Sequence, residues 1–258
     1  MKDTAILFVA HQVTCDTMGR FDKLRSDLSD TCDVFWGIQV DGEDGKRELP
    51  KGIPFYMFSL SSIRKLGYEP LYDDSVLGSV NFILQRFYKD FPCYRRYWSI
   101  EFDVVFTGNW HALVDSFVNE GADFVSCHIE RYDKEKNGSW DWWQPLFWVD
   151  EQIGLDECVK AFNPIFSLSR RAMDFLDKFL RKGSCGHFET VMSTALYHYG
   201  FTLLDMGGMG EFTPPSFRNR FYVQGSGINN GTMRFRPNFL KEEIAALGVQ
   251  DKLFHPLK

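Results

Sequence analysis

Two short apolar runs lie close together near the start of the chain, with a segment of helical spacing between them. Residues 5–10 are almost continuously apolar, which is typical of a strand buried on both faces of a parallel sheet. Residues 21–28 carry apolar side chains at helical intervals, and residues 34–40 form a second strand-like run. A strand, a helix and a strand at this spacing predict a βαβ unit, and therefore an α/β fold.

Polar residues follow both of these predicted strands. His11 and Gln12 come directly after the first strand, and Asp41 opens a polar turn, 41–45, after the second. In open α/β sheets, ligands bind beyond the carboxyl ends of the strands. We therefore expect these three residues at the rim of a binding site, although the alternative of ordinary loop residues stays open.

The stretch 96–110 places two acids at the end of an apolar strand. Apolar and polar residues alternate from position 98 to position 103, so Glu101 and Asp103 are expected to project from one face, just before a turn at 107–109. Neighbouring carboxylates repel each other and are costly to bury unless a positive charge joins them. Mg²⁺ and Mn²⁺ prefer carboxylate oxygen, so the stretch predicts a divalent-cation site. The alternative is the solvated face of an edge strand.

The remaining periodic segments continue the alternation of strands and helices. Strands are expected at 53–60, 123–128 and 202–204, and helices at 75–88 and 110–119, with 163–169 leading into a helix that ends at Gly183. A turn is expected at Ser61 and Ser62, and Thr107 or Asn109 would cap the helix at 110–119.

A tryptophan-rich loop at 132–148 has neither a helical nor a strand period. Such a loop either packs over the core or stacks on a ligand, and the indole ring suits the C–H face of a sugar. We regard four residues of this loop and of the segment that follows it as candidate acceptor-binding residues: Trp140, Trp142, Trp143 and Asn163.

A late helix is expected to open at 186–190 and to stop at Gly200. Glu189 lies in its first turn, where a carboxylate is either a general base at a site rim or an ordinary partner of the helix dipole. The segment 207–238 is rich in Gly, Pro and Asn and carries arginines, among them Arg234 and Arg236, that can bind phosphate. The tail adds His255 and Lys258.

Composition excludes several classes of protein. The chain has 258 residues, 44% of them hydrophobic and 16% aromatic, which suits a folded domain with a substantial core. The net charge of −6 disfavours a nucleic-acid partner. The start is too short and too acidic for a signal peptide, and no apolar run approaches the roughly 20 residues of a membrane span. The six cysteines show no Cys-x-x-Cys spacing, so we expect reduced thiols in a cytoplasmic protein, with peripheral membrane association left open.

Taken in order, these parts resemble the glycosyltransferases of the A-type fold. The resemblance rests on Glu101-Phe102-Asp103 as a variant of the Asp-x-Asp metal motif, on Glu189, and on His255. The runs 97–108, 234–237 and 254–258 are also similar to an uncharacterised bacterial and fungal set of proteins related to glycosyltransferases. The sequence departs from the family pattern in having Glu101 where the first Asp is expected. The resemblance implies one Rossmann-like domain over 1–258, with a mixed, mostly parallel sheet flanked by helices.

The resemblance also implies an activity and roles for the residues. The enzyme would move a sugar from a nucleoside-diphosphate donor to a hydroxyl of a glycan or lipid-linked acceptor, with inversion, and would use Mn²⁺ or Mg²⁺. Residues 1–104 would form the nucleotide-sugar half and 105–258 the acceptor half, including the metal-binding tail. Glu101, Asp103 and His255 would hold the cation, and Glu189 would be the base. The donor-binding residues would be His11, Gln12, Asp41, Arg234, Arg236 and Lys258.

Two other functions stay open. A sugar nucleotidyltransferase usually has a glycine-rich phosphate loop after its first strand, whereas here no glycine follows that strand before Gly19. A non-catalytic carbohydrate- or nucleotide-binding module would account for the tryptophans but not for the cation-binding residues.

Overall fold

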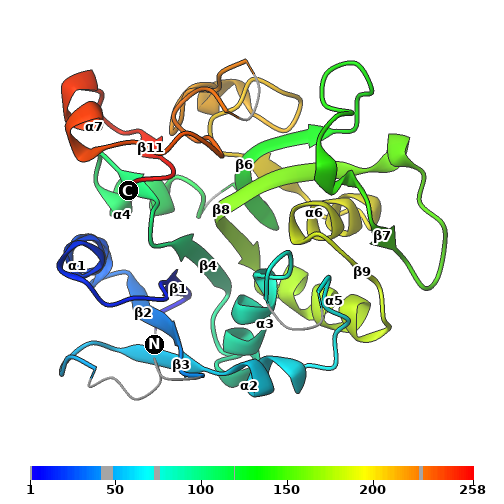
Figure 1. The fold of residues 1–258 in the computed structure, drawn as a ribbon, viewed down its shortest axis with the longest axis horizontal. Helices are drawn as coiled ribbons and strands as arrows, with labels where there is room; N and C mark the ends of the chain where they lie inside the picture. The colour runs from blue at the N-terminus through cyan, green and yellow to red at the C-terminus, as the bar shows by residue number, and fades with distance from the viewer. Residues whose placement is uncertain (1, 42–48, 73–75, 119, 227–228) are drawn as a thin grey trace.

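The computed structural model describes residues 2–41, 49–72, 76–118, 120–226 and 229–258 (Figure 1). Its centre is a seven-stranded sheet in the order β10-β6-β8-β4-β1-β2-β3, accompanied by two small sheets, β5 with β11 and β7 with β9. The strands are β1 Thr4–Val9, β2 Cys32–Gln39, β3 Phe55–Phe58, β4 Arg96–Glu101, β5 Val105–Phe106, β6 Phe124–Arg131, β7 Leu146–Phe147, β8 Val159–Ser169, β9 Cys185–Gly186, β10 Leu203–Asp205 and β11 Leu253–Phe254. The helices are α1 Cys15–Leu28, α2 Leu60–Arg64, α3 Asn81–Asp90, α4 Trp110–Asp115, α5 Arg170–Arg181, α6 Phe188–His198 and α7 Lys241–Leu247.

The central sheet is mixed and mostly parallel. Strand β1 runs parallel to β2 and β4, β2 runs parallel to β3, and β10 runs parallel to β6, whereas β8 is antiparallel to both of its neighbours, β4 and β6. Side chains of α3, α5 and α6 pack in one hydrophobic core, and side chains of α1 and α4 pack in a second. The predicted α/β fold, with a mostly parallel sheet flanked by helices, is therefore confirmed.

The first βαβ unit is confirmed, although its helix is longer than predicted. Helix α1 begins at Cys15 because the side chain of Thr14 accepts a hydrogen bond from the N–H of Thr17. The same chemistry overturns the predicted turn at Ser61 and Ser62. The hydroxyl of Ser59 accepts a hydrogen bond from the N–H of Ser62 and so starts α2.

Several other boundaries differ from the predictions. Helix α3 begins at Asn81, later than the predicted start at position 75, which lies outside the described residues, as do positions 42–45 of the predicted polar turn. Helix α4 ends at Asp115, and Asn109, one of the two predicted caps, accepts a hydrogen bond from the N–H of His111. Strand β8 begins at Val159, four residues before the predicted segment.

The strand that carries the acids lies inside the sheet. Strand β4 lies between β8 and β1, so the alternative of an edge strand is wrong. Ser99 is buried, because helices cover both faces of the sheet, so the solvated face of that alternative is absent at this position. Strand β4 ends at Glu101, and Asp103 lies in the turn that follows.

All six cysteines are free thiols. No helix in the described ranges combines the length and the apolar character that crossing a membrane requires.

Candidate active site

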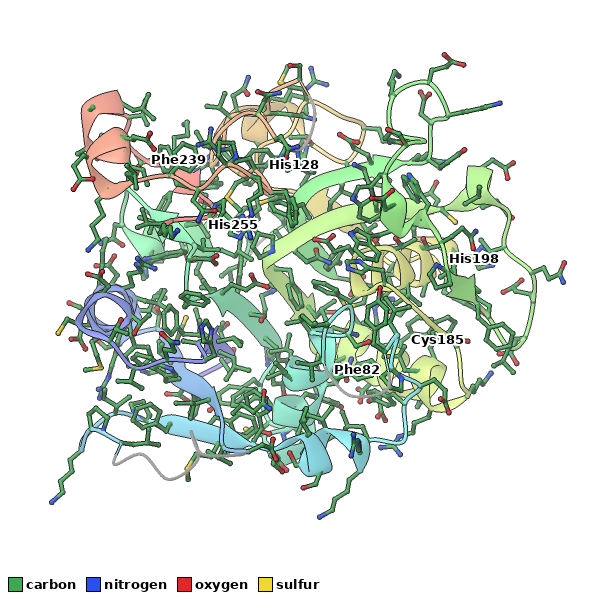
Figure 2. The ribbon with its side chains drawn as sticks, in the orientation of Figure 1. Phe82, His128, Cys185, His198, Phe239 and His255 are labelled. Carbon is green, nitrogen blue, oxygen red and sulfur yellow. The ribbon has the colours of Figure 1, made fainter. Side chains whose placement is uncertain are left out.

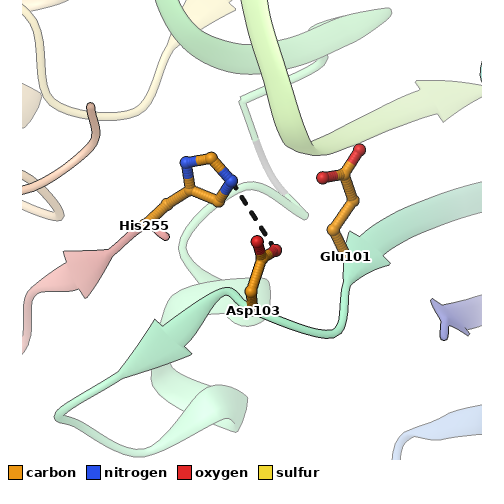
Figure 3. A group of neighbouring side chains, drawn as sticks. All are labelled: Glu101, Asp103 and His255. Carbon is orange, nitrogen blue, oxygen red and sulfur yellow. Dashed lines mark ion pairs between the residues drawn. The ribbon is translucent and has the colours of Figure 1, made fainter. Parts of the chain in front are cut away.

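Three predicted cation ligands from distant parts of the chain meet at the carboxyl end of β4. Strand β11 pairs with β5, and the N–H of Leu257 donates to the carbonyl of Asp103 at 2.9 Å, so the tail lies beside the turn after β4. Ligand atoms of Glu101, Asp103 and His255 lie within 4.8 Å of one another (Figure 3). We call these three side chains the acidic triad.

The hydrogen bonds of His255 leave two acceptors facing each other. Its Nδ1 lies 2.8 Å from the carbonyl oxygen of Arg234, which can only accept, so Nδ1 carries the proton and Nε2 presents a lone pair. That Nε2 lies 3.6 Å from Oδ1 of Asp103, a buried oxygen without a hydrogen-bond donor in the described part of the chain. Burial lowers the pKa of His255, and the ring is therefore neutral at pH 7. A carboxylate oxygen opposite an imidazole lone pair fits a bound divalent cation, with the Arg234 carbonyl orienting the imidazole from behind.

Glu101 adds a second carboxylate without a partner. Among the described residues, neither of its oxygens receives a hydrogen bond. Burial raises the pKa of Glu101 to about 8, and the charges of Asp103 and Glu189 add to this rise. A bound cation would reverse these effects, since it stabilises the ionised carboxylate. The residues present therefore suit Mg²⁺ or Mn²⁺.

Glu189 lies in the first turn of α6, as predicted, and is buried. Its Oε1 accepts a hydrogen bond of 3.0 Å from the backbone N–H of Asn163, and its Oε2 lies 3.8 Å from Nδ1 of His187. Burial raises the pKa of Glu189 to about 7, although the Asn163 hydrogen bond and the charge of Lys160 oppose the rise. Burial also lowers the pKa of His187 to about 4, so this neighbour is a neutral ring.

A cavity of about 1520 Å³ joins the acidic triad to Glu189. Its volume exceeds that of typical small-ligand sites, which suits two substrates bound side by side. The predicted site residues that line it are Glu101, Asp103, Trp140, Trp142, Glu189, Arg236 and His255. The structure thus brings residues from the middle of the chain, the late helix and the tail around one cavity.

The tryptophan-rich loop is divided between the core and the cavity wall. Trp143 and Trp148 are buried, and Nε1 of Trp143 donates to the carbonyl of Asn137. Trp140 and Trp142 line the cavity instead. The Trp142 ring stacks on His187 with centroids 4.6 Å apart and an angle of 13° between the rings.

The remaining predicted residues do not line the cavity. The His11 ring packs edge-on against Phe102, the carbonyl of Gln12 accepts from Thr17, and the carboxylate of Asp41 accepts from the N–H of Leu60. The guanidinium of Arg234 lies 3.6 Å from the centre of the Phe239 ring, and Lys258 is exposed at the end of the chain. Asn163 is buried behind the cavity wall.

Sequence reasoning missed three residues of this cavity. Lys160 is buried, pairs with Glu130 at 3.3 Å and lies with its ammonium nitrogen 5.3 Å from the centre of the Trp140 ring. The Nδ1 of His187 accepts the backbone N–H of Glu189, and His128 lines the wall from β6. No local pattern marks Lys160 or His128, whereas the position of His187 two residues before Glu189 was a usable signal.

No family model matches the sequence, and no curated protein matches it. Solved structures of similar fold include an active-site variant of LgtC, at 9% identity and a TM-score of 0.46 over 91% of this chain and 88% of that one. They also include a protein described as a glucose-1-phosphate thymidylyltransferase from Bacillus anthracis, in complex with sucrose, at 13% identity and a TM-score of 0.46 over 81% and 88%. A third is mouse xyloside xylosyltransferase 1 without ligand, at 12% identity and a TM-score of 0.44 over 80% and 85%. This likeness concerns the arrangement of the backbone, and the geometry of the cavity alone bears on activity.

Proposed function

We propose that this protein is a metal-dependent glycosyltransferase. It moves a sugar from a nucleoside-diphosphate donor to a hydroxyl of a glycan or lipid-linked acceptor, with inversion at the anomeric carbon. One observation carries the proposal: the acidic triad and the buried carboxyl of Glu189 share a single cavity. In this proposal, residues 1–104 form the nucleotide-sugar half and residues 105–258 the acceptor half.

The acidic triad forms the donor end of the cavity in this proposal. A Mn²⁺ or Mg²⁺ ion held by Glu101, Asp103 and His255 would neutralise negative charge on the diphosphate leaving group. Arg236 lines the same cavity and adds a positive charge for the phosphates. Arg234, Lys258, His11, Gln12 and Asp41 remain proposed donor-binding residues.

Glu189 is the proposed general base. An acceptor hydroxyl is a weak nucleophile, and it becomes stronger as its proton moves to a nearby base. In a single displacement, the hydroxyl oxygen bonds to the anomeric carbon, the bond from that carbon to the diphosphate oxygen breaks, and the proton passes to Glu189. The pKa of about 7 suits this role, since the group is substantially ionised at neutral pH and still takes up a proton. The Asn163 N–H holds one carboxylate oxygen and so fixes the orientation of the other.

The aromatic side of the cavity is the proposed acceptor end. Trp140 and Trp142 supply ring faces on which a sugar can stack, and Trp143 packs against the Trp140 ring with centroids 5.2 Å apart. Thr190 Oγ1 donates to the carbonyl of Trp142 at 2.6 Å, which ties this wall to the helix that carries Glu189.

Nucleotide release tests the proposal against its alternatives. The purified protein is incubated with UDP- and GDP-sugars, with and without Mn²⁺ and a glycan acceptor, and melting is followed with nucleoside diphosphates. We expect Mn²⁺-dependent stabilisation by one nucleotide and release of that nucleotide with sugar transfer. Pyrophosphate release from a nucleoside triphosphate and a sugar 1-phosphate would instead indicate a nucleotidyltransferase. Carbohydrate binding without any release would indicate a non-catalytic module.

A further inference from the structure

Strand β6 contains a distortion at the point where it reaches the cavity. Its register against β8 shifts between Val125 and Cys127 and again between Cys127 and Glu130. His128, within the second shift, has φ of 49°, in the left-handed region that side-chain-bearing residues rarely adopt. Bulges of this kind next to active sites commonly redirect a side chain.

The distortion is held in place by buried side chains. The backbone N–H of His128 donates to the hydroxyl of Tyr222 at 2.8 Å, and the N–H of Ile129 donates to Oδ2 of Asp205 at 2.8 Å. The Tyr222 hydroxyl in turn donates to Asp205, and both side chains are buried. Strained backbone persists only where its surroundings fix it, and strain near a ligand site commonly serves that site.

The imidazole of His128 has one free lone pair. Its Nε2 lies 2.7 Å from the carbonyl oxygen of Met233, which can only accept, so Nε2 carries the proton. Burial lowers the pKa of His128, the ring is neutral, and Nδ1 therefore presents a lone pair. Nδ1 has no hydrogen-bond partner in the described ranges, and His128 lines the cavity.

His128 lies close to the acidic triad without belonging to it. The Phe162 ring contacts both imidazoles, with its centroid 6.0 Å from that of His128 and 5.2 Å from that of His255. Figure 2 labels His128 and His255 in the same part of the molecule. Phe162 also lines the cavity. A molecule bound beside the triad and over Phe162 is therefore within reach of both rings.

We propose that His128 is a substrate-binding residue whose Nδ1 accepts a hydrogen bond from a hydroxyl group of the sugar bound in this cavity. Naming the ligand as a sugar rests on the proposed function. A lone pair attracts a hydrogen-bond donor and repels phosphate or carboxylate oxygen, so this wall favours a neutral, hydroxylated part of the substrate. A sugar without that hydroxyl leaves Nδ1 unpaired in a dry site, and binding should weaken.

Diethyl pyrocarbonate, which acylates unprotonated imidazole nitrogen, tests the lone pair without any substrate. We expect peptide mass spectrometry to find His128 and His255 modified, and Mn²⁺ to protect only His255. His187 is the matched control, because its Nδ1 already accepts the N–H of Glu189 and its ring is stacked on Trp142. An unmodified His128 would overturn the inference. A His255 that Mn²⁺ fails to protect would count against the proposed function alone.

Variants at His128 test its role in binding. His128→Gly accepts the same backbone conformation and keeps the N–H that binds Tyr222, so the bulge should survive without the imidazole. With whichever UDP- or GDP-sugar the wild type uses, we expect KM to rise about 5- to 100-fold with little change in kcat. The loss should vanish for the one deoxy analogue that lacks the paired hydroxyl. An equal loss for every deoxy analogue, or a fall in kcat alone, would contradict the proposed contact. The variant His128→Asn is the folding control, and its melting temperature should equal that of the wild type.

Discussion

Two groups of acids in this molecule have opposite surroundings. Asp205, at the end of β10, accepts hydrogen bonds from three backbone N–H groups and from the Tyr222 hydroxyl. Burial raises its pKa, and the backbone hydrogen bonds oppose that rise. Glu101 and Asp103 are only partly buried, and one oxygen of Asp103 is enclosed without a donor in the described part of the chain and faces an imidazole lone pair.

The difference separates a structural carboxylate from one that is ready to bind a ligand. An acid such as Asp205, whose carboxylate oxygens accept several hydrogen bonds, contributes to the stability of the fold, because its removal would leave those donors unpaired. A carboxylate that lacks hydrogen-bond donors lowers the stability of the fold until it binds a cation or a proton. Glu189 falls between the two, with one oxygen held by Asn163 and the other 3.8 Å from His187.

The largest expected effect is on turnover in Glu189→Gln. Loss of the base should lower kcat by about 10²–10⁴ in a nucleotide-release assay, while Mn²⁺ and nucleotide affinity stay unchanged. The matched control is Glu242→Gln, which alters an exposed acid in the first turn of α7 and so tests the helix-dipole effect alone. Turnover within threefold of the wild type would show that Glu189 belongs with Asp205 as a structural acid.

Asp103→Asn should separate binding from folding. The amide keeps the shape of the side chain and removes its charge, so Mn²⁺ affinity measured by calorimetry should fall by about 100-fold or more. Stability without cation should be equal or higher, because the repulsion between Asp103 and Glu101 is removed. Asp141→Asn, an exposed acid that lines the same cavity, should leave Mn²⁺ affinity unchanged. A destabilised variant with normal Mn²⁺ affinity would show that Asp103 is a structural acid and not a cation ligand.

Asp205→Ala should show the opposite pattern. Its backbone donors would be left buried and unpaired, so the free energy of unfolding should fall by on the order of 3 kcal/mol in a denaturant titration. Asp205→Asn keeps one acceptor oxygen and should lose less. The part of Asp205→Ala that remains folded should bind Mn²⁺ normally. Unchanged stability would mean that hydrogen-bond saturation does not mark structural acids in this molecule.

The fold was readable from sequence where a single element decides the pattern. The first βαβ unit was predicted, because strands buried on both faces leave continuous apolar runs. Helix α2 was missed, since Ser61 and Ser62 suit a turn as well as a capped helix start, and only the hydrogen bond to Ser59 decides between them. The alternative of a solvated edge strand at β4 was wrong, because its neighbour β8 and the covering helices come from elsewhere in the chain.

The candidate site could also be predicted only in part from the sequence. Glu101 and Asp103 were proposed because they lie at the end of a predicted strand, where side chains reach ligands. The roles of Glu189 and His255 were what the family resemblance implied. Lys160 lies within the long buried strand β8, and the orientation of His128 depends on a bulge and on the distant Asp205. Neither leaves a trace in local periodicity, because both arise from contacts between segments far apart in the chain.

The smallest expected effect is the pH dependence of the wild type. The pKa of Glu189 is raised to about 7, and a general base acts in its ionised form. At saturating Mn²⁺, kcat/KM should therefore rise about tenfold per pH unit below 7 and level off above it. The residual kcat/KM of Glu189→Gln should not show this rise with pH. Between pH 6.5 and 8 the free protein should also lose stability, because the folded state holds protons on Glu101 and Glu189 that the unfolded state has released. Below pH 6.5 the lowered pKa values of His128, His187 and His255 oppose this trend. Mn²⁺ should restore the stability lost between pH 6.5 and 8 by binding the ionised form of Glu101. A melting temperature that rises over this window without cation would contradict the inference that the ionised forms of these acids lack partners in the folded protein.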